Sequence, residues 1–175
     1  PRGDLLATDA GNQIRLWRTD TWNLVSQLTL AGRVQFLKFS PDGRRLACMS
    51  RLPAKVTVWE VDQWTVVREI RDVKPALTHK GVVDFSPDGK ALVIGDADHR
   101  LRVFDLASGN TDVNIPKAHP EGITAVAWSP NGSVIASGSG FSSPSPIRLW
   151  DSASGKTLGV LEGHTSWISN LIFSA

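Results

Sequence analysis

Apolar and polar residues alternate over short stretches of this chain, and turn-forming residues separate the stretches. Between residues 81 and 115 four such stretches read GVVDFS, ALVIGD, RLRVFDL and TDVNI. Alternation with a period of two predicts β-strands, whose successive side chains point to opposite faces of a sheet. The sequence SPDG after the first stretch favours a tight turn, because proline presets φ, aspartate bonds back to the backbone and glycine accepts positive φ. No stretch has the 3.6-residue period of a long amphipathic helix, so we expect four antiparallel strands in this unit.

The same unit recurs along the whole chain. A turn proline is repeated at spacings of 40, 46 and 43 residues, at Pro1, Pro41, Pro87 and Pro130. An aromatic residue near the end of the third stretch is repeated at spacings of 42, 45 and 46 residues, at Trp17, Trp59, Phe104 and Trp150. Two independent landmarks with one period indicate a repeat architecture. We therefore predict an all-β protein of four units, each a four-stranded antiparallel sheet.

These motifs resemble the WD-repeat (tryptophan-aspartate repeat) family of β-propellers, and the resemblance covers essentially the whole chain. The motifs that carry it are FSPDG, the third-strand sequence IRLWD ending at Asp151, and LEGH ending at His164. The resemblance implies that each unit forms a radial four-stranded blade and that the third-strand aromatic packs between neighbouring blades. Only Trp150 and Asp151 form a true Trp-Asp pair, since the other units carry Trp-Arg, Trp-Glu and Phe-Asp.

The resemblance also implies a hydrogen-bond network inside each blade. The family joins a His before the first strand, a Ser or Thr in the second, the third-strand Trp, and an Asp in the turn before that Trp. His119 and His164 fall at the His position, Ser137 and Thr8 at the hydroxyl position, and Asp98 at the Asp position. The other units carry Gly11, Pro53 and Pro144 at the Asp position. No unit has the full set, so we expect blades of unequal stability, with about 1 kcal/mol for each satisfied member.

The two ends of the chain each carry half of one motif. NLIFSA at the C-terminus followed by PRGDLLAT at the N-terminus reproduces the pattern of LKFSPDGRRLAC. We therefore expect the first blade, with strands in residues 4–30, to lack its own first strand and to be completed by the C-terminal strand at about Ile168–Ser174. The resemblance implies this arrangement, because the family closes its rings with one blade shared by both termini.

Four repeats make about half of a seven- or eight-bladed ring, which needs roughly 300 residues or more at this period. We take residues 1–175 as a single WD-repeat propeller unit, and three interpretations stay open. The chain is a segment of a longer protein, or two copies close into an eight-bladed ring, or one copy closes alone with four blades.

One face of the predicted propeller offers a candidate site for a protein or peptide partner. In this family the loops before the first strands contribute to a face that usually binds peptides or other domains. The residue eight positions before each turn proline opens the first strand there, which selects Arg33, His79, Gly122 and Trp167. An aromatic anchor such as Trp167 is a common hot spot at interfaces. The alternative is that Trp167 covers the neighbouring core.

A candidate aromatic patch lies on the opposite face. Trp22 is five residues after Trp17, and Trp64 is five residues after Trp59, where the other two units carry Gly109 and Gly155. Two neighbouring units thus replace a turn glycine with tryptophan. Either the two side chains stack against each other or cover the bottoms of the blades, or they form a contact patch for another subunit or domain.

Composition narrows the function further. The net charge of +2 is too small to predict nucleic acid or an anionic membrane as a partner. No apolar run approaches the roughly 18 residues that span a bilayer. Cys48 is the only cysteine, so an internal disulfide is excluded, and with no signal peptide in the sequence we expect a cytoplasmic protein.

Catalytic motifs are absent from the sequence. The four histidines show no metal-ligand spacing, and no phosphate-binding glycine loop, GxSxG elbow or HExxH motif occurs. We therefore expect no enzymatic activity, no metal and no cofactor. The prediction is a non-catalytic protein–protein interaction scaffold. The alternative is a self-assembling structural module, natural or engineered, whose partner is a second copy of itself in a homodimeric eight-bladed ring.

Overall fold

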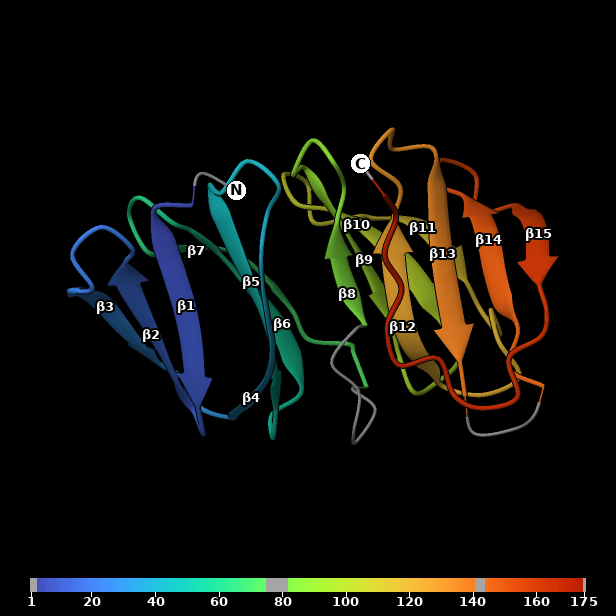
Figure 1. Cartoon of the computed structure of the whole chain (residues 1–175), viewed down its shortest axis with the longest axis horizontal. Coiled ribbons are helices and arrows are strands. Elements are labelled where there is room, and N and C mark those ends of the chain that lie inside the picture. The colour runs from blue at the N-terminus through green and yellow to red at the C-terminus, as the bar shows by residue number, and fades with distance from the viewer. Residues whose placement is uncertain (1–2, 75–81, 141–143, 175) are drawn as a thin grey trace. The chain divides into compact units, whose positions relative to one another are not determined.

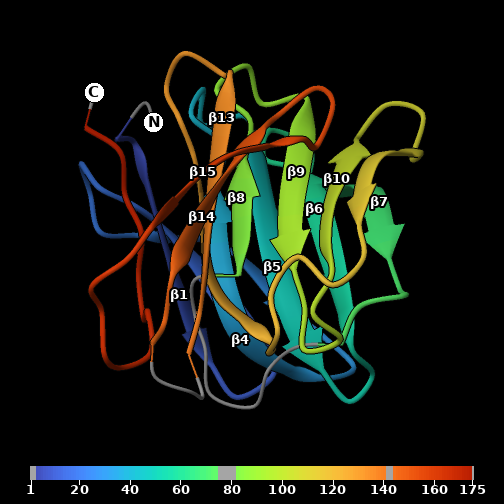
Figure 2. The same ribbon diagram turned by 90° about the vertical axis from the view of Figure 1, so that its right-hand side faces the viewer.

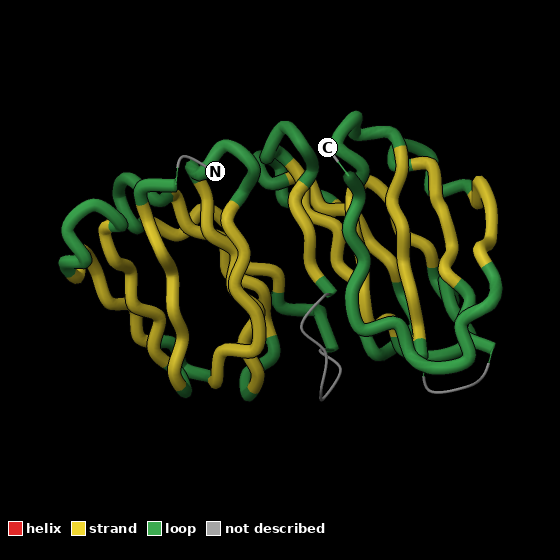
Figure 3. Tube along the Cα trace, viewed as in Figure 1, coloured by secondary structure: helices red, strands yellow, loops and turns green. Residues whose placement is uncertain are grey.

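The computed structural model describes residues 3–74, 82–140 and 144–174 (Figure 1). Every regular element in these ranges is a β-strand, and the strands are joined by turns and loops (Figure 3). The predicted all-β fold with antiparallel sheets is confirmed. The chain divides into two compact units, Pro1–Val73 and Lys74–Ala175.

The first unit contains two antiparallel sheets. The first sheet has the order β1-β2-β3 and consists of β1 (Leu5–Ala10), β2 (Gln13–Arg18) and β3 (Leu24–Thr29). The second sheet has the order β4-β5-β6-β7 and consists of β4 (Arg33–Phe39), β5 (Arg45–Arg51), β6 (Lys55–Glu60) and β7 (Thr65–Ile70). The first sheet therefore has three strands, at the positions expected for the second, third and fourth strands of its repeat.

The second unit contains two four-stranded antiparallel sheets. The third sheet consists of β8 (Val83–Phe85), β9 (Ala91–Gly95), β10 (Leu101–Asp105) and β11 (Thr111–Ile115). Figure 2 shows β9 and β10 as neighbours in this sheet. The fourth sheet consists of β12 (Ile123–Trp128), β13 (Val134–Ser139), β14 (Ile147–Asp151) and β15 (Thr157–Leu161).

The C-terminal segment after β15 differs from the expectation. Ile168–Ser174 forms no strand, although the repeat pattern predicts one there. A strand needs a ladder of backbone hydrogen bonds, and among the described residues this segment has one such bond, from Ile168 N to Ser139 O (3.3 Å). Completion of the first sheet by this segment stays a prediction.

One turn geometry recurs between the first two strands of three sheets. In the second sheet Ser40 Oγ donates to Asp42 Oδ1 (2.6 Å), and the same carboxylate oxygen accepts from Arg44 N (3.0 Å). Arg45 N in turn donates to Ser40 Oγ (2.9 Å), and Gly43 takes the left-handed φ of 71°. The same bonds form around Ser86 and Asp88 and around Ser129 and Asn131. The SPDG and SPNG motifs therefore specify a turn stabilised by its own side chains.

A second recurring turn contains Trp22 and Trp64, the two tryptophans that stand where the other repeats have glycine. The backbone is left-handed at Trp22 (φ 58°) and Trp64 (φ 52°), as it is at Gly109 and Gly155 (φ 79° and 70°). Trp22 N donates to Arg18 O (2.9 Å), and Gly155 N makes the equivalent bond to Asp151 O (2.8 Å). The tryptophans thus occupy turn positions where an L-residue is strained and glycine is not.

In each unit the described residues include an apolar core to which both sheets contribute. In the first unit Leu16 packs with Leu46, Cys48 and Trp59. Burial, with a small contribution from Asp9, raises the pKa of the Cys48 thiol to about 12. The thiol is therefore protonated and behaves as a small apolar side chain. In the second unit the core joins both sheets through the residues Val93, Leu101, Val103, Val113, Ala118, Ile123, Val126, Ile135 and Trp150.

Candidate functional site

The fourth sheet contains a buried network of three side chains. His119 is 1% exposed, and its Nε2 lies 2.7 Å from Ser137 Oγ. Trp150 Nε1 donates to the same hydroxyl oxygen (2.8 Å). The resemblance to the WD-repeat family implied these three residues at the His, hydroxyl and Trp positions of the network. His119 comes from the segment before β12, Ser137 from β13 and Trp150 from β14.

The fourth member of this network is missing. His119 Nδ1 is buried and has no hydrogen-bond partner among the described residues, and Pro144 stands where the family carries Asp. Burial, followed by the positive charge of Arg148, lowers the pKa of His119 to about 4. The imidazole is therefore neutral near pH 7. The His119 side chain is 1% exposed, so little of the ring is accessible from solvent.

The other residues assigned to this network lie in different surroundings. Trp17 Nε1 donates to Thr8 Oγ1 (3.0 Å) in the first sheet, where both groups are accessible to solvent. His164 is exposed, and its carbonyl accepts from Ser145 N (3.0 Å). Trp59 and Phe104 are buried, as expected for the third-strand aromatic.

The carboxylate that organises the turn of the third sheet is Asp96, which the sequence analysis missed. Asp96 is 1% exposed and accepts from Arg100 Nε (3.1 Å) and Arg102 Nη2 (3.2 Å). Asp98 is exposed and pairs with Lys74 Nζ (2.7 Å), while its backbone N donates to Asp96 Oδ1 (3.0 Å). The signal in the sequence was Arg102, a charged residue at a buried position of the alternating stretch LRVFD.

The residues of the predicted partner face are only partly described. Arg33 is exposed at the start of β4, and His79 lies outside the described residues. Trp167 is 51% exposed and follows β15 in the second unit. Because Arg33 and Trp167 belong to different units, their common face stays a prediction.

The backbone beside Trp167 is closely packed on β13. A Cβ added to Gly140 would lie 2.1 Å from Trp167 Cβ, and one added to Gly138 would lie 2.6 Å from Ile168 Cβ. Thr124 Oγ1 donates to Ile168 O (2.6 Å), and the Ile168 side chain is buried. The absence of side chains at the two glycines thus allows this segment to pack closely on them, while half of the surface of Trp167 remains exposed to solvent.

The two tryptophans of the opposite patch differ in burial. Trp22 is 66% exposed, whereas Trp64 is half-buried and packs against the core of the first unit. Trp64 therefore covers the core, and Trp22 presents most of its indole to solvent.

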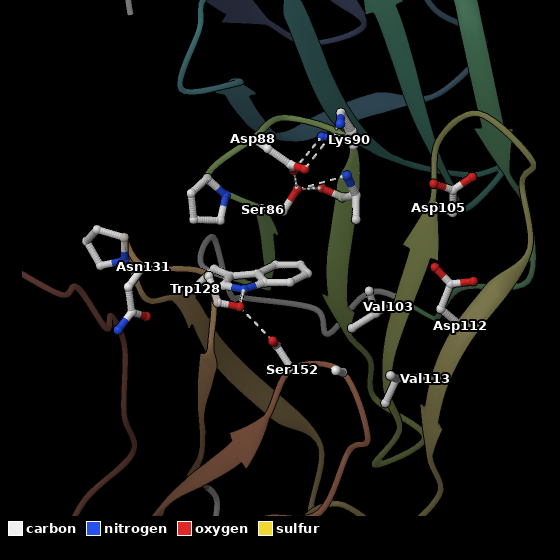
Figure 4. A pocket seen from close by; sticks show the side chains of 15 residues that line it. Ser86, Asp88, Lys90, Val103, Asp105, Asp112, Val113, Trp128, Asn131 and Ser152 are labelled. Atoms are coloured by element: carbon white, nitrogen blue, oxygen red, sulfur yellow. Dashed lines mark hydrogen bonds and ion pairs between the residues drawn. The ribbon is translucent and has the colours of Figure 1, made fainter.

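A pocket of about 560 Å³ lies between the third and fourth sheets of the second unit (Figure 4). Its walls are the SPDG and SPNG turns, the β10–β11 hairpin and the turn after β14. The indole of Trp128 lies across it, and the carboxylates of Asp105 and Asp112 lie on the wall formed by β10 and β11 (Figure 4). The repeat pattern does not predict this site, because its lining comes from segments up to 67 residues apart, from Ser86 to Ala153.

Groups suited to metal binding do not occur in the part of the chain that the structure describes, where no three His, Cys, Asp or Glu side chains come together. The described residues also include no helix with the length and apolar character needed to cross a bilayer.

The fold and its repeated turns define the class of protein, an all-β repeat of antiparallel sheets, three of them four-stranded, consistent with propeller blades. The family model "WD domain, G-beta repeat" matches residues 77–105 and 110–142. The chain is 26% identical over 177 residues to the transcriptional corepressor LEUNIG_HOMOLOG of Arabidopsis thaliana, covering 99% of this chain and 21% of that protein. It is 27% identical over 151 residues to the serine-threonine kinase receptor-associated protein of Gallus gallus, covering 84% and 39%.

A third relative is the WD repeat-containing protein VIP3 of Arabidopsis thaliana, 28% identical over 184 residues, covering 97% of this chain and 55% of that protein. The matched repeats and these relatives support a WD-repeat family for this chain. It spans between about a fifth and somewhat more than half of the length of these three relatives.

Proposed function

We propose that this chain is a non-catalytic scaffold for protein–protein interaction, with a protein or peptide as its partner. The observation that carries the proposal is the packing of Trp167, whose backbone is held closely while its side chain is half exposed. Its backbone is fixed against Gly140 and next to the buried Ile168, while half of its surface remains exposed. A large aromatic side chain on a rigid support binds with little loss of conformational entropy. Two relatives carry names that describe a corepressor and a receptor-associated protein, which supports the same class of function.

The test is a pull-down with Trp167→Ala. We expect the variant to lose a protein that the unchanged chain recovers, while its mass in solution stays the same. Leu158→Ala is the matched control, since Leu158 is another large apolar side chain that is more than half exposed in the same unit. Equal recovery by Trp167→Ala and the unchanged chain would contradict the proposal.

The other parts of this proposal rest on charge and chemistry. The +2 net charge favours a protein partner over nucleic acid or an anionic membrane. The neutral, buried His119 and the protonated Cys48 support a role without catalysis. Cys48 as a single reduced thiol supports a cytoplasmic location. Arg33 and His79 are proposed to share the partner face with Trp167.

Self-association is the second candidate function, and it stands on a specific observation. The first sheet has three strands where the others have four, and the C-terminal segment presents Ile172 at 88% exposure. A sheet that lacks its first strand has unpaired backbone groups along its edge strand. An extended apolar segment that forms no strand of its own can pair with such an edge. Light scattering separates the cases: a 38 kDa species (2 × 19.0) supports a homodimeric ring, and a well-behaved 19 kDa monomer excludes it.

The exposed Trp22 is the remaining part of the proposed aromatic patch. Its 66% exposure favours a contact for another subunit or domain over a purely internal packing role. Quenching of tryptophan fluorescence by acrylamide, compared between the unchanged chain and Trp22→Phe, measures access to this indole. If the Trp22 contribution is not quenched, the patch does not exist.

A further inference from the structure

The pocket beside Trp128 carries a sharper inference about the partner. We propose that it binds an arginine side chain of a protein partner, with the guanidinium lying on the indole and facing the carboxylates of Asp105 and Asp112 (Figure 4). The inference rests on the proposed function only in taking the ligand to be part of a protein. The site itself is separate from Trp167, so the two are tested independently.

The charge of the pocket selects a cation. Its lining contains three aspartates and one lysine, which gives a formal charge of −2 (1 minus 3) in a chain of net charge +2. The Asp88 carboxylate accepts hydrogen bonds from Ser86 Oγ (2.7 Å) and Lys90 N (3.1 Å). Lys90 Nζ lies 3.9 Å from the same carboxylate. The hydrogen bond from Ser86 lowers the pKa of Asp88, so this carboxylate is ionised and its charge is largely balanced locally. The excess negative charge belongs to Asp105 and Asp112.

These two carboxylates differ in how they are held. Asp105 Oδ1 accepts from Ser108 N (2.6 Å) and Ser108 Oγ (2.7 Å), which fixes the orientation of its side chain. Asp112 is exposed on β11, and its side chain has no hydrogen bond or ion pair with any described residue. A cation entering the pocket thus meets one oriented carboxylate and one that is available for pairing.

The indole is a fixed platform. Trp128 Nε1 donates to Gly132 O (3.0 Å), and Trp128 N donates to Asp84 Oδ2 (2.9 Å). Ser152 Oγ also donates to Gly132 O (2.6 Å), which ties the turn after β14 to the same carbonyl. With its donor already used, the indole offers the pocket an aromatic surface. Such a surface attracts a guanidinium by cation–π interaction and stacking.

The apolar part of the lining suits the stem of an arginine. Val103 and Val113 lie beside the two carboxylates and the indole (Figure 4). An arginine buries its methylene groups along such side chains while its charged head pairs with carboxylates. An anion is disfavoured by the −2 charge, and a lysine lacks the planar head that both stacks and pairs in bidentate fashion.

The test is a titration of the isotope-labelled 175-residue chain, followed by NMR at the indole N–H resonance of Trp128. The resonance is identified by its loss in Trp128→Phe. The probes are the capped peptides Gly-Gly-Arg-Gly-Gly, Gly-Gly-Lys-Gly-Gly and the neutral citrulline analogue of the first. We expect a saturable shift with the arginine peptide, about threefold weaker binding of the lysine peptide, and at least about tenfold weaker binding of the citrulline peptide. Equal binding of the citrulline peptide would overturn the proposal.

Charge variants locate the site without disturbing the core. Asp112→Asn should weaken binding of the arginine peptide about threefold to fivefold, the range for one partly solvated ion pair. Glu162→Gln removes the same charge from an exposed position of the same unit outside the pocket, and should leave the affinity unchanged. An unchanged affinity in Asp112→Asn, or an equal loss in Glu162→Gln, overturns the assignment.

One further variant separates this inference from the proposed function. Trp167→Ala should keep the affinity for the arginine peptide, since Trp167 is not part of the pocket lining. If the peptide does not bind while the pull-down still depends on Trp167, only the arginine pocket is refuted. If the pull-down fails to depend on Trp167 while the peptide binds, the partner face is refuted and the pocket remains.

Discussion

Ser137 Oγ lies 2.8 Å from the indole Nε1 of Trp150 and accepts its hydrogen bond inside the fourth sheet. The same oxygen lies 2.7 Å from Nε2 of His119, so one hydroxyl satisfies two buried ring nitrogens. The equivalent pair in the first sheet, Thr8 and Trp17, has a comparable distance of 3.0 Å but is accessible to solvent. The two sheets therefore allow the same bond to be compared in buried and solvated surroundings.

Ser137→Ala should destabilise the fold because it leaves two buried nitrogens without a partner. We expect a loss of about 2–4 kcal/mol in the free energy of unfolding, measured by urea denaturation. Thr8→Ala is the control and should cost less than about 1 kcal/mol, since water replaces the lost acceptor. A similar loss in both variants would show that burial of the network does not matter.

His119 should make stability depend on pH. Burial lowers its pKa in the folded chain to about 4, against an ordinary value of 6.5. Between these values the unfolded chain binds the proton and the folded chain does not, so stability is fully present above pH 6.5 and falls as the pH falls toward 4. The pKa difference corresponds to about 3 kcal/mol in total.

The measurement is urea denaturation between pH 4 and pH 7 for the unchanged chain and for His119→Gln. The difference between the two curves isolates His119 from carboxylates that titrate lower. The unchanged chain should lose more stability than the variant over this interval. Parallel curves would mean that His119 is accessible to solvent.

The packing of the C-terminal segment on β13 should be disturbed by a single added methyl group. A Cβ on Gly138 would lie 2.6 Å from Ile168 Cβ, so Gly138→Ala should displace the segment at a cost of about 1–3 kcal/mol. Faster amide exchange at Ile168 is the direct readout. Gly159→Ala, where the added Cβ meets nothing within 4 Å, should leave that exchange unchanged. Equal exchange rates in both variants would place the segment away from β13.

The two strained tryptophans should respond in opposite directions to glycine. Both have a left-handed backbone, and relief of that strain should make Trp22→Gly more stable by up to about 1 kcal/mol, net of the extra freedom of glycine in the unfolded chain. Trp64→Gly also loses packing against the first core, and should be less stable by about 2 kcal/mol. Thermal melting of the two variants checks the sign. A destabilised Trp22→Gly would show that its indole packs more closely than its exposure indicates.

Local sequence determined the strands and turns of this protein. Alternation with a period of two located the strands, and SPDG located the turns because Ser40 and Asp42 satisfy that turn with their own side chains. The repeat spacing also placed Trp22 at a position equivalent to glycine, because the turn geometry depends on a few consecutive residues. The family resemblance, not local geometry, implied that His119, Ser137 and Trp150 belong to one network.

Only the tertiary structure decided which polar groups are buried and which surfaces are hollow. Asp96 rather than Asp98 organises the third sheet, because burial depends on how Arg100 and Arg102 reach the turn from the neighbouring strand. The pocket beside Trp128 depends on the packing of one sheet against another, so no single stretch of sequence encodes it. Strand patterns record local backbone preference, whereas a site formed by several segments exists only once long-range packing has brought their side chains together.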